Sequence, residues 1–165
     1  KKSMKKHFLV IAALILAAFT GCQKEQSEFT TESLQGTCTL QGKVTYDKGV
    51  TADDLVTHIE SKASGVTVVL SIDYSAYATG ATGKKYYTTT TDEDGNYSFT
   101  VAVGSTPINA SNVKIGIAPF EKTYGFVNTS SEFKIEQRLY TIFTPASATF
   151  ENYQAVVRNL YVKCE

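Results

Sequence analysis

Few side chains in this sequence are placed to do chemistry. After residues 1–21 the chain holds one histidine, His58, with no second histidine or cysteine beside it to complete a zinc site. No Gly-x-Ser-x-Gly motif marks an acyl-transfer nucleophile. Residues 78–85 approach a phosphate-binding loop, but Ala78 stands where its first glycine belongs and Lys85 where its Ser or Thr belongs. We therefore predict no catalytic residue, no cofactor and no enzyme activity.

Oxygen ligands at alternate positions are the pattern of a calcium loop, and Asp92, Asp94 and Asn96 follow it. The pattern then fails, because Tyr97 stands where an EF-hand has glycine and Val103 where it has a bidentate glutamate. Acidic and amide side chains are also common at tight corners, where they hydrogen-bond to the backbone. We predict a capped corner and no metal site.

The beginning of the chain has the pattern of an export signal. Met4 is a suitable initiator, and Lys5 and Lys6 form a basic head. The apolar run that follows, residues 8–19, is too short to span a bilayer. A basic head and a short apolar segment are typical of a secretory signal peptide, which we assign to residues 1–21.

The end of this segment resembles the lipobox of bacterial lipoproteins. Thr20 and Gly21 are the small residues that precede the obligatory Cys22, and Phe19 departs from the usual leucine. The resemblance implies cleavage before Cys22 and its acylation, palmitate included, so that several acyl chains hold the protein stably on a lipid bilayer. Residues 23–25 lack the aspartate associated with inner-membrane retention, so we expect the outer membrane of a gram-negative cell envelope, on its periplasmic or its surface side. An ordinary signal peptide with a chance cysteine is the alternative.

Charge and composition limit the partners of the exported chain. Four of the 16 basic side chains and none of the 16 acidic ones lie in residues 1–21, so the remainder is mildly acidic. A surface of this charge with Arg138 and Arg158 as its arginines argues against nucleic-acid binding. Residues 22–36 are polar and read as a lipidated flexible tether. Residues 37–165 are long enough for one domain with its own core.

The clearest β-pattern lies in residues 86–103, which we expect to form a hairpin. Gly95 supplies the positive φ that a tight corner at residues 92–96 needs. Beyond the corner, large apolar residues alternate with the small residues Ser98, Thr100 and Ala102, with the period of a pleated strand that is buried on one face. The apolar residues are Tyr97, Phe99, Val101 and Val103.

Similar alternation predicts most of the remaining chain to be strands. The expected strands are residues 38–46, 66–74, 113–117, 133–143 and 155–164. Residues 51–62 have the one helical pattern, with Thr51 as N-cap and Leu55, Val56 and Ile59 as a short apolar stripe. About seven short strands with one short helical insertion predict an all-β fold, an antiparallel β-sandwich with Greek-key connections.

Three segments look like the carboxypeptidase regulatory-like domain. They are Gly42-Lys43-Val44, then Gly65-Val66-Thr67-Val68, and the corner from Thr91 to Phe99. The resemblance covers residues 38–103 and implies a transthyretin-like sandwich of the kind found as non-catalytic modules in surface and secreted proteins. Some similar adhesin repeats carry an isopeptide bond, for which Lys43 and Asn159 are the nearest candidates. Strand alternation directs Lys43 outward, so we do not expect this bond.

Two cysteines remain if Cys22 is lipidated. Cys38 and Cys164 lie on the first and last expected strands, which are often neighbours in sandwiches, and exported compartments permit oxidation. We predict a disulfide between them. The alternative is two separate buried thiols, since free cysteine behaves as a small hydrophobe.

Four aromatic residues fall in expected loops, where they could contact a ligand. Tyr77 lies in residues 75–83, and Phe120, Tyr124 and Phe126 lie in residues 120–131. Such rings cover the ends of a sandwich, or they stack on a sugar or fill a partner's pocket. The sequence therefore leaves two functions open. The first is a non-catalytic envelope lipoprotein that serves as a structural or protein-interaction module, and the second is a surface protein that binds a glycan or peptide through these loops.

Overall fold

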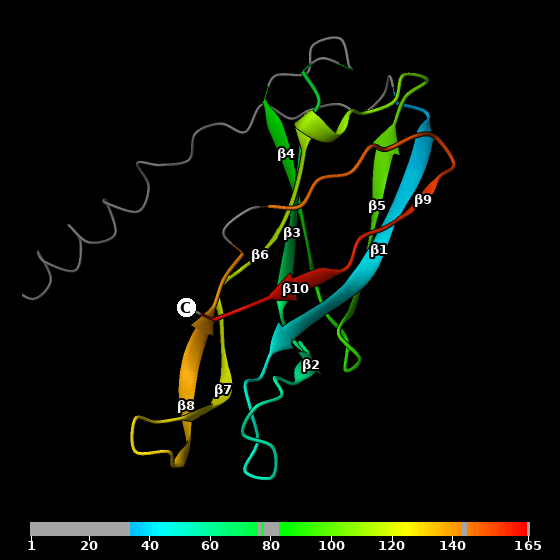
Figure 1. Cartoon of the computed structure of the whole chain (residues 1–165). Coiled ribbons are helices and arrows are strands. Elements are labelled where there is room, and N and C mark those ends of the chain that lie inside the picture. Colours follow the sequence, from blue (N-terminus) through cyan, green and yellow to red (C-terminus); the bar gives the residue numbers. More distant parts are fainter. Residues whose placement is uncertain (1–33, 76, 78–82, 143–144, 165) are drawn as a thin grey trace, which may run out of the picture.

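The computed structural model describes residues 34–75, 77, 83–142 and 145–164, and these residues are all-β (Figure 1). The expected signal peptide, Cys22 and most of the expected tether lie outside the described residues. The described residues form ten strands and a short 3-10 turn, η2 (Ala110–Asn112). The strands are β1 (Gly36–Asp47), β2 (Glu60–Lys62), β3 (Thr67–Asp73), β4 (Lys84–Thr90), β5 (Asn96–Val103), β6 (Val113–Ile117), β7 (Phe120–Val127), β8 (Phe133–Tyr140), β9 (Ala155–Val157) and β10 (Leu160–Val162).

The long strand β1 is the centre of the first sheet. β5 and then β2 pair with it antiparallel along one edge, while β9 and then β10 pair with it parallel along the other. The first and last strands are thus neighbours, but the sheet is mixed and not wholly antiparallel. The last expected strand divides in two where the chain passes Gly42, on which a Cβ atom would lie 1.7 Å from the Arg158 carbonyl oxygen.

Two further strand groups complete the fold. β3 lies between β4 and β6 in an antiparallel sheet, and β7 pairs with β8 as an antiparallel ribbon. Figure 1 shows β3, β4 and β6 beside the sheet of β1, β5 and β9, with the ribbon at the opposite end of the molecule from η2. The N–H of Val50 donates to the Gly125 carbonyl (2.9 Å), so the segment after β1 joins the ribbon to the first sheet.

The buried faces of these sheets meet in one hydrophobic core cluster. The tyrosine that follows β3, Tyr74, links the two sheets, because its hydroxyl donates to the Ala102 carbonyl in β5 (2.9 Å). The alternation predicted for the first, third and fifth strands is confirmed. Their buried side chains are Cys38, Leu40, Val44, Tyr46, Val68, Leu70, Ile72, Tyr97, Phe99, Val101 and Val103.

The hairpin predicted for residues 86–103 is wrong in its pairing. β4 bonds to β3, and β5 bonds to β1, so the corner carries the chain from one sheet to the other. Buried Thr91 fixes that crossing, with its Oγ1 donating to the Ala63 carbonyl (2.5 Å) and accepting from the Val66 N–H (2.9 Å). Alternation shows which face of a strand is buried, but it does not show which strand is the hydrogen-bonding partner.

The helix predicted for residues 51–62 is also wrong. Asp54 donates its N–H to Thr51 Oγ1 (3.2 Å) as an N-cap contact would require, yet its own carboxylate accepts from the N–H groups of Val56 and Thr57 in a turn. The expected apolar stripe is exposed, with Val56 at 85%. A helix this short is marginal without a packed face. The segment runs as a loop into β2.

The expected loop at residues 120–131 is largely strand β7, a second correction to the element assignment. Proline and glycine are typical of loops, and Pro119 and Gly125 lie in or beside this stretch. Gly125 instead serves close packing within the sheet, since a Cβ atom on it would lie 2.2 Å from the Val50 carbonyl oxygen. The strand count rises from about seven to ten through β2, β7 and the division of the last strand.

Candidate functional site

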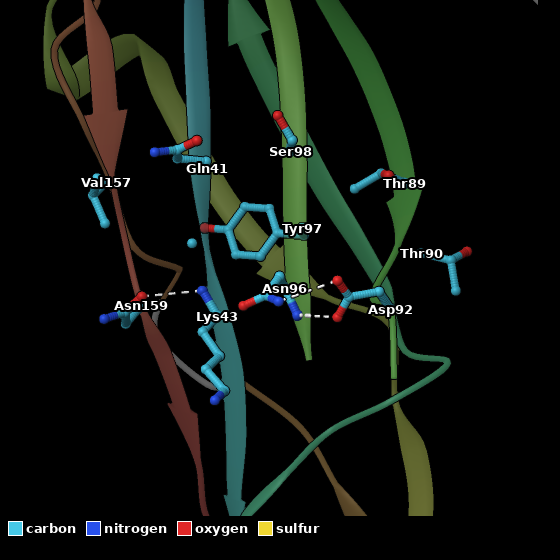
Figure 2. Close-up of a pocket in the computed structure, with 11 residues that line it drawn as sticks. Gln41, Lys43, Thr89, Thr90, Asp92, Asn96, Tyr97, Ser98, Val157 and Asn159 are labelled. Carbon is cyan, nitrogen blue, oxygen red and sulfur yellow. Dashed lines mark hydrogen bonds between the residues drawn. The ribbon is translucent and has the colours of Figure 1, made fainter. Parts of the chain in front are cut away.

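An open groove of about 560 Å³ lies beside the β4 to β5 corner, lined by residues of β1, β5 and β9 in the first sheet and of β4 in the second (Figure 2). The side chains of its walls are mostly amides and hydroxyls, which donate and accept hydrogen bonds without supplying a nucleophile. The lining residues are Gln41, Gly42, Lys43, Thr89, Thr90, Asp92, Asn96, Tyr97, Ser98, Val157 and Asn159.

Hydrogen bonds within the protein fix the positions of Asn159 and Tyr97 in this groove. Figure 2 shows the Asn159 side-chain oxygen accepting from the backbone N–H of Lys43 (3.0 Å). Tyr97 packs its ring over Gly42 and donates its hydroxyl to the Arg158 carbonyl (2.7 Å), and burial raises the pKa of that hydroxyl to about 12. The hydrogen bond between Lys43 and Asn159 is therefore made by the backbone N–H of Lys43 and not by its side-chain amine, which an isopeptide bond would require. The Asn159 amide serves to bind β10 to β1.

The Asp92 carboxylate caps the corner at the edge of the groove. One of its oxygens accepts from the N–H groups of Asp94 (2.9 Å) and Asn96 (2.8 Å), and the other accepts from the Asn96 side chain (3.1 Å). These bonds, the Asn96 backbone contact first, lower the pKa of the Asp92 carboxyl. Asp94 pairs with Lys62. Within the part of the chain that the structure describes, no three His, Cys, Asp or Glu side chains are grouped to hold a metal ion.

A second cluster, the aromatic cluster, lies between the β7–β8 ribbon and the end of β1. Phe120 stacks on Tyr140 (centroids 5.3 Å apart, planes 14° apart) and meets Tyr46 edge-on (6.0 Å). The Arg138 guanidinium lies 4.2 Å from the Tyr124 ring centroid. Phe126 lies on the same ribbon face, 5.5 Å from that guanidinium. Three of the four predicted ligand-binding aromatics are therefore brought together, but they lie on a strand and contact the protein itself.

Tyr77, the fourth predicted aromatic, lies at the other end of the fold. Its hydroxyl accepts from the backbone N–H of Asn109 (2.9 Å) and from the side-chain amide of Asn112 (2.9 Å), which ties its loop to η2. Its contacts are those of a residue that closes the end of the core.

A buried carboxylate that sequence reasoning missed lies at the end of β1. Asp47 accepts from the Gly49 N–H (2.8 Å), and one of its oxygens lies 2.8 Å from His58 Nδ1. The Tyr140 hydroxyl donates to the Asp47 backbone carbonyl (2.7 Å). His58 thereby pins the exposed 51–59 loop to β1. The polar turn after β1 was visible in the sequence, but its pairing with His58 was not.

The predicted Cys38–Cys164 disulfide is not formed, and both thiols are free. Cys38 lies where β1 pairs with β5. Cys164 lies beyond the far end of β1, where its backbone forms an isolated β-bridge with Tyr140. Tyr46 pairs with Val162, so the two cysteines are separated by about ten residues along β1, roughly 33 Å at 3.3 Å per residue. A disulfide needs Cα atoms within about 7 Å. The neighbouring strands were predicted, but their register was not.

The outer edge of β8 is a long strand edge that carries exposed apolar side chains. β7 covers one edge of β8, and on the other edge the described residues contribute one bridge, from Cys164 to Tyr140 at its end. Ile135 is 64% exposed and Leu139 is 55% exposed, both on the face away from the aromatic cluster. Figure 1 places β8 at the margin of the molecule, on the outer side of β7.

None of the helical turns in the described residues is long and apolar enough to cross a membrane. No protein-family model matches the sequence, and no curated protein matches it. Among solved structures, the chain is similar to the major plantain pollen allergen, with a TM-score of 0.41 and 14% identity over 78% of this chain and 94% of that one. A likeness at this level carries no argument about function or family.

Proposed function

We propose that this chain is a lipid-anchored protein of the bacterial cell envelope, with a non-catalytic β-sandwich that serves as a structural or protein-interaction module. The packing of the first sheet against the β4-β3-β6 sheet on one core cluster supports the sandwich. The transthyretin-like, carboxypeptidase regulatory-like assignment is part of the proposal and rests on the motifs at residues 42–44, 65–68 and 91–99.

The observation that carries the interaction role is the outer edge of β8, along which no strand of the described residues pairs. A strand edge presents N–H and C=O groups in a row, and natural sheets usually cover, shorten or charge such an edge. β8 is eight residues long and exposes Ile135 and Leu139, although it also carries charges at Lys134, Glu136 and Arg138. Addition of a partner strand to such an edge is a common mode of protein recognition.

The anchor rests on the sequence around Cys22. Leu34, about 12 residues after that cysteine, is buried in the core. A chain of that length reaches at most about 40 Å from the bilayer when fully extended. The partner of the module would therefore lie in the same membrane or close to its surface.

A second candidate, binding of a glycan or peptide, is favoured by the polar groove and not by the predicted loop aromatics. Gln41, Thr89 and Ser98 present amide and hydroxyl groups toward open space there. Sugar hydroxyls and peptide amides bind such groups. Binding of an oligosaccharide or peptide that is lost in the Gln41→Ala and Ser98→Ala variants would support this candidate.

Site-specific photocrosslinking in intact cells tests the interaction role. A photoreactive residue at position 135 on the β8 edge is compared with one at Val56, which is 85% exposed in the 51–59 loop and outside the groove. We expect a discrete crosslinked protein from position 135 and a much weaker one from position 56. Equal or absent crosslinking at the two positions would remove the support that the β8 edge gives.

A further inference from the structure

We propose that the β8 edge pairs with the β8 edge of a second copy of this chain, antiparallel and centred on Ile135. This inference deepens the proposed function by naming the partner. It rests on the lipid anchor only for the local concentration of the two copies.

The backbone groups of β8 that point away from β7 can be identified from the hydrogen bonds of the β7–β8 ribbon. The Asn128 N–H donates to the Glu132 carbonyl (3.0 Å), and Val127 stands opposite Phe133. In an antiparallel ladder the bonded pairs alternate. The even-numbered residues of β8 therefore bond to β7, and the odd-numbered residues 133, 135 and 137 direct N–H and C=O to the outer edge.

A two-fold pairing must then match odd-numbered residues with odd-numbered ones, so its axis passes through a residue. An axis at Lys134 or at Glu136 would place each of these charges opposite itself, which is unfavourable. An axis at Gln137 would place Ile135 opposite Leu139, where the bridge from Cys164 already occupies that end of β8.

An axis at Ile135 avoids these conflicts. It places Lys134 of each copy opposite Glu136 of the other, on one face of the new pair. The same register brings Glu132 of each copy opposite Arg138 of the other. On the opposite face the two exposed Ile135 side chains meet, an apolar cross-strand contact.

Charged side chains on an edge strand ordinarily prevent pairing with other chains. On β8 they alternate in sign, and the alternation is complementary to itself when the strand is reversed. A two-fold interface uses the same surface on both copies and closes as a dimer, without leaving an edge to propagate. The complementarity therefore selects a second copy of this chain over an unspecified strand.

The pairing spans residues 133–137, with roughly six backbone hydrogen bonds for five residues on each side. An interface this small is below the size of stable soluble dimers, so the copies should associate weakly in dilute solution. Anchoring at Cys22 would confine them to a surface and raise their effective concentration. Trapping is therefore a better test than a hydrodynamic measurement.

The test is disulfide trapping in the full chain. The protein is studied in membranes of the cells that express it or after purification in detergent, and both preparations are oxidised with copper phenanthroline. In the proposed register the two Cα atoms of residue 135 lie about 5.5 Å apart, within the range of a disulfide. Ile135→Cys should give a reducible dimer, and the parent chain with its native cysteines should not. Gln137→Cys is the matched control, since its two copies would lie about 13 Å apart along the strand. Absence of a dimer from Ile135→Cys, or an equal dimer from Gln137→Cys, would overturn the proposal.

Charge reversal in the Ile135→Cys background tests the register independently. Lys134→Glu or Glu136→Lys alone should reduce the trapped dimer roughly tenfold, because each change opposes like charges at two symmetry-related positions. The double variant, Lys134→Glu with Glu136→Lys, should restore trapping. Melting temperatures of all variants report any loss of folding. Failure of the double variant to recover, with its fold intact, would contradict the proposed pairing.

These outcomes separate the dimer from the proposed function. Trapping that persists in the Cys22→Ser chain keeps the dimer and removes only the role of the anchor. A crosslink from position 135 to a different protein, without a trapped dimer, keeps the interaction role and overturns the second copy as partner.

Discussion

Gly49 and Gly125 pair in a parallel bridge so close that a Cβ atom on Gly49 would lie 2.0 Å from the Gly125 carbonyl oxygen. Gly49 also has a φ of 79°, a backbone angle that residues other than glycine rarely adopt. The contact holds β7 against the segment after β1, and β7 in turn holds β8. The position of the proposed interaction edge thus depends on two glycines from distant parts of the sequence.

Replacing Gly125 with alanine should destabilise the domain, because the added Cβ would lie 2.2 Å from the Val50 carbonyl oxygen. Overpacking of this kind costs about 1–3 kcal/mol. Urea unfolding of the full chain measures the change. Gly116→Ala in β6 is the matched control, since no atom lies within 4 Å of its Cβ position. Equal free energies of unfolding for the two variants would contradict the close approach of β7 to Val50.

Gly95→Val should also destabilise the domain, for two separable reasons. The φ of Gly95 is 80°, where a β-branched residue is strained by about 1–3 kcal/mol, and its Cβ would lie 2.6 Å from the Val44 carbonyl oxygen. Gly65→Val carries the strain alone, because Gly65 has a φ of 73° and no atom within 4 Å of its Cβ position. The melting temperature should fall further for the first variant. An unchanged melting temperature in Gly95→Val would contradict the corner geometry.

Acid should weaken the fold partly through Asp92. Its pKa is lowered in the folded chain by hydrogen bonds from Asn96, so its contribution is present above the ordinary pKa near 3.9 and lost as the pH falls through the folded value. Hydrogen bonds lower the pKa values of the Asp54, Asp73 and Glu132 carboxyls too. Urea midpoints from pH 6 to pH 2 should show wild type above Asp92→Asn at pH 6, with the gap narrowing in acid. Parallel curves would mean that the Asp92 bonds do not favour its charged form.

The two thiols of the folded part should react separately. Burial raises the pKa of the Cys38 thiol, which disfavours the reactive thiolate, while Cys164 is partly exposed. Alkylation of the native, unreduced chain should therefore label Cys164 well before Cys38. After denaturation without reductant both should be labelled. A chain that resists labelling at both positions until it is reduced would restore the disulfide.

Local pattern predicted the strands well where one face is buried. Leu40 and Phe99 lie between polar neighbours, and their burial follows from period two alone. The positive φ of Gly95 was predicted from its place in a polar corner, and it is confirmed.

The pairing and register of the strands could not be predicted from the sequence, because they depend on contacts between residues that are distant along the chain. The 92–96 corner crosses between sheets, since Thr91 bonds to Ala63 and Val66, and no local pattern announces that bond. The same holds for the outer edge of β8, because the local sequence does not show that no other strand among the described residues pairs along it. The sequence offers few residues that could act as catalytic or metal-binding groups. The contact between His58 and Asp47 joins two segments whose proximity only the fold shows.

The central claim, a domain held on a membrane through Cys22, is tested most directly by the Cys22→Ser variant of the full chain. Cells grown with labelled palmitate are fractionated, and label and chain are followed together. We expect the wild-type chain to carry label and sediment with membranes, whereas Cys22→Ser should carry none and leave the membrane fraction. Label and membrane association that both persist in Cys22→Ser would contradict it.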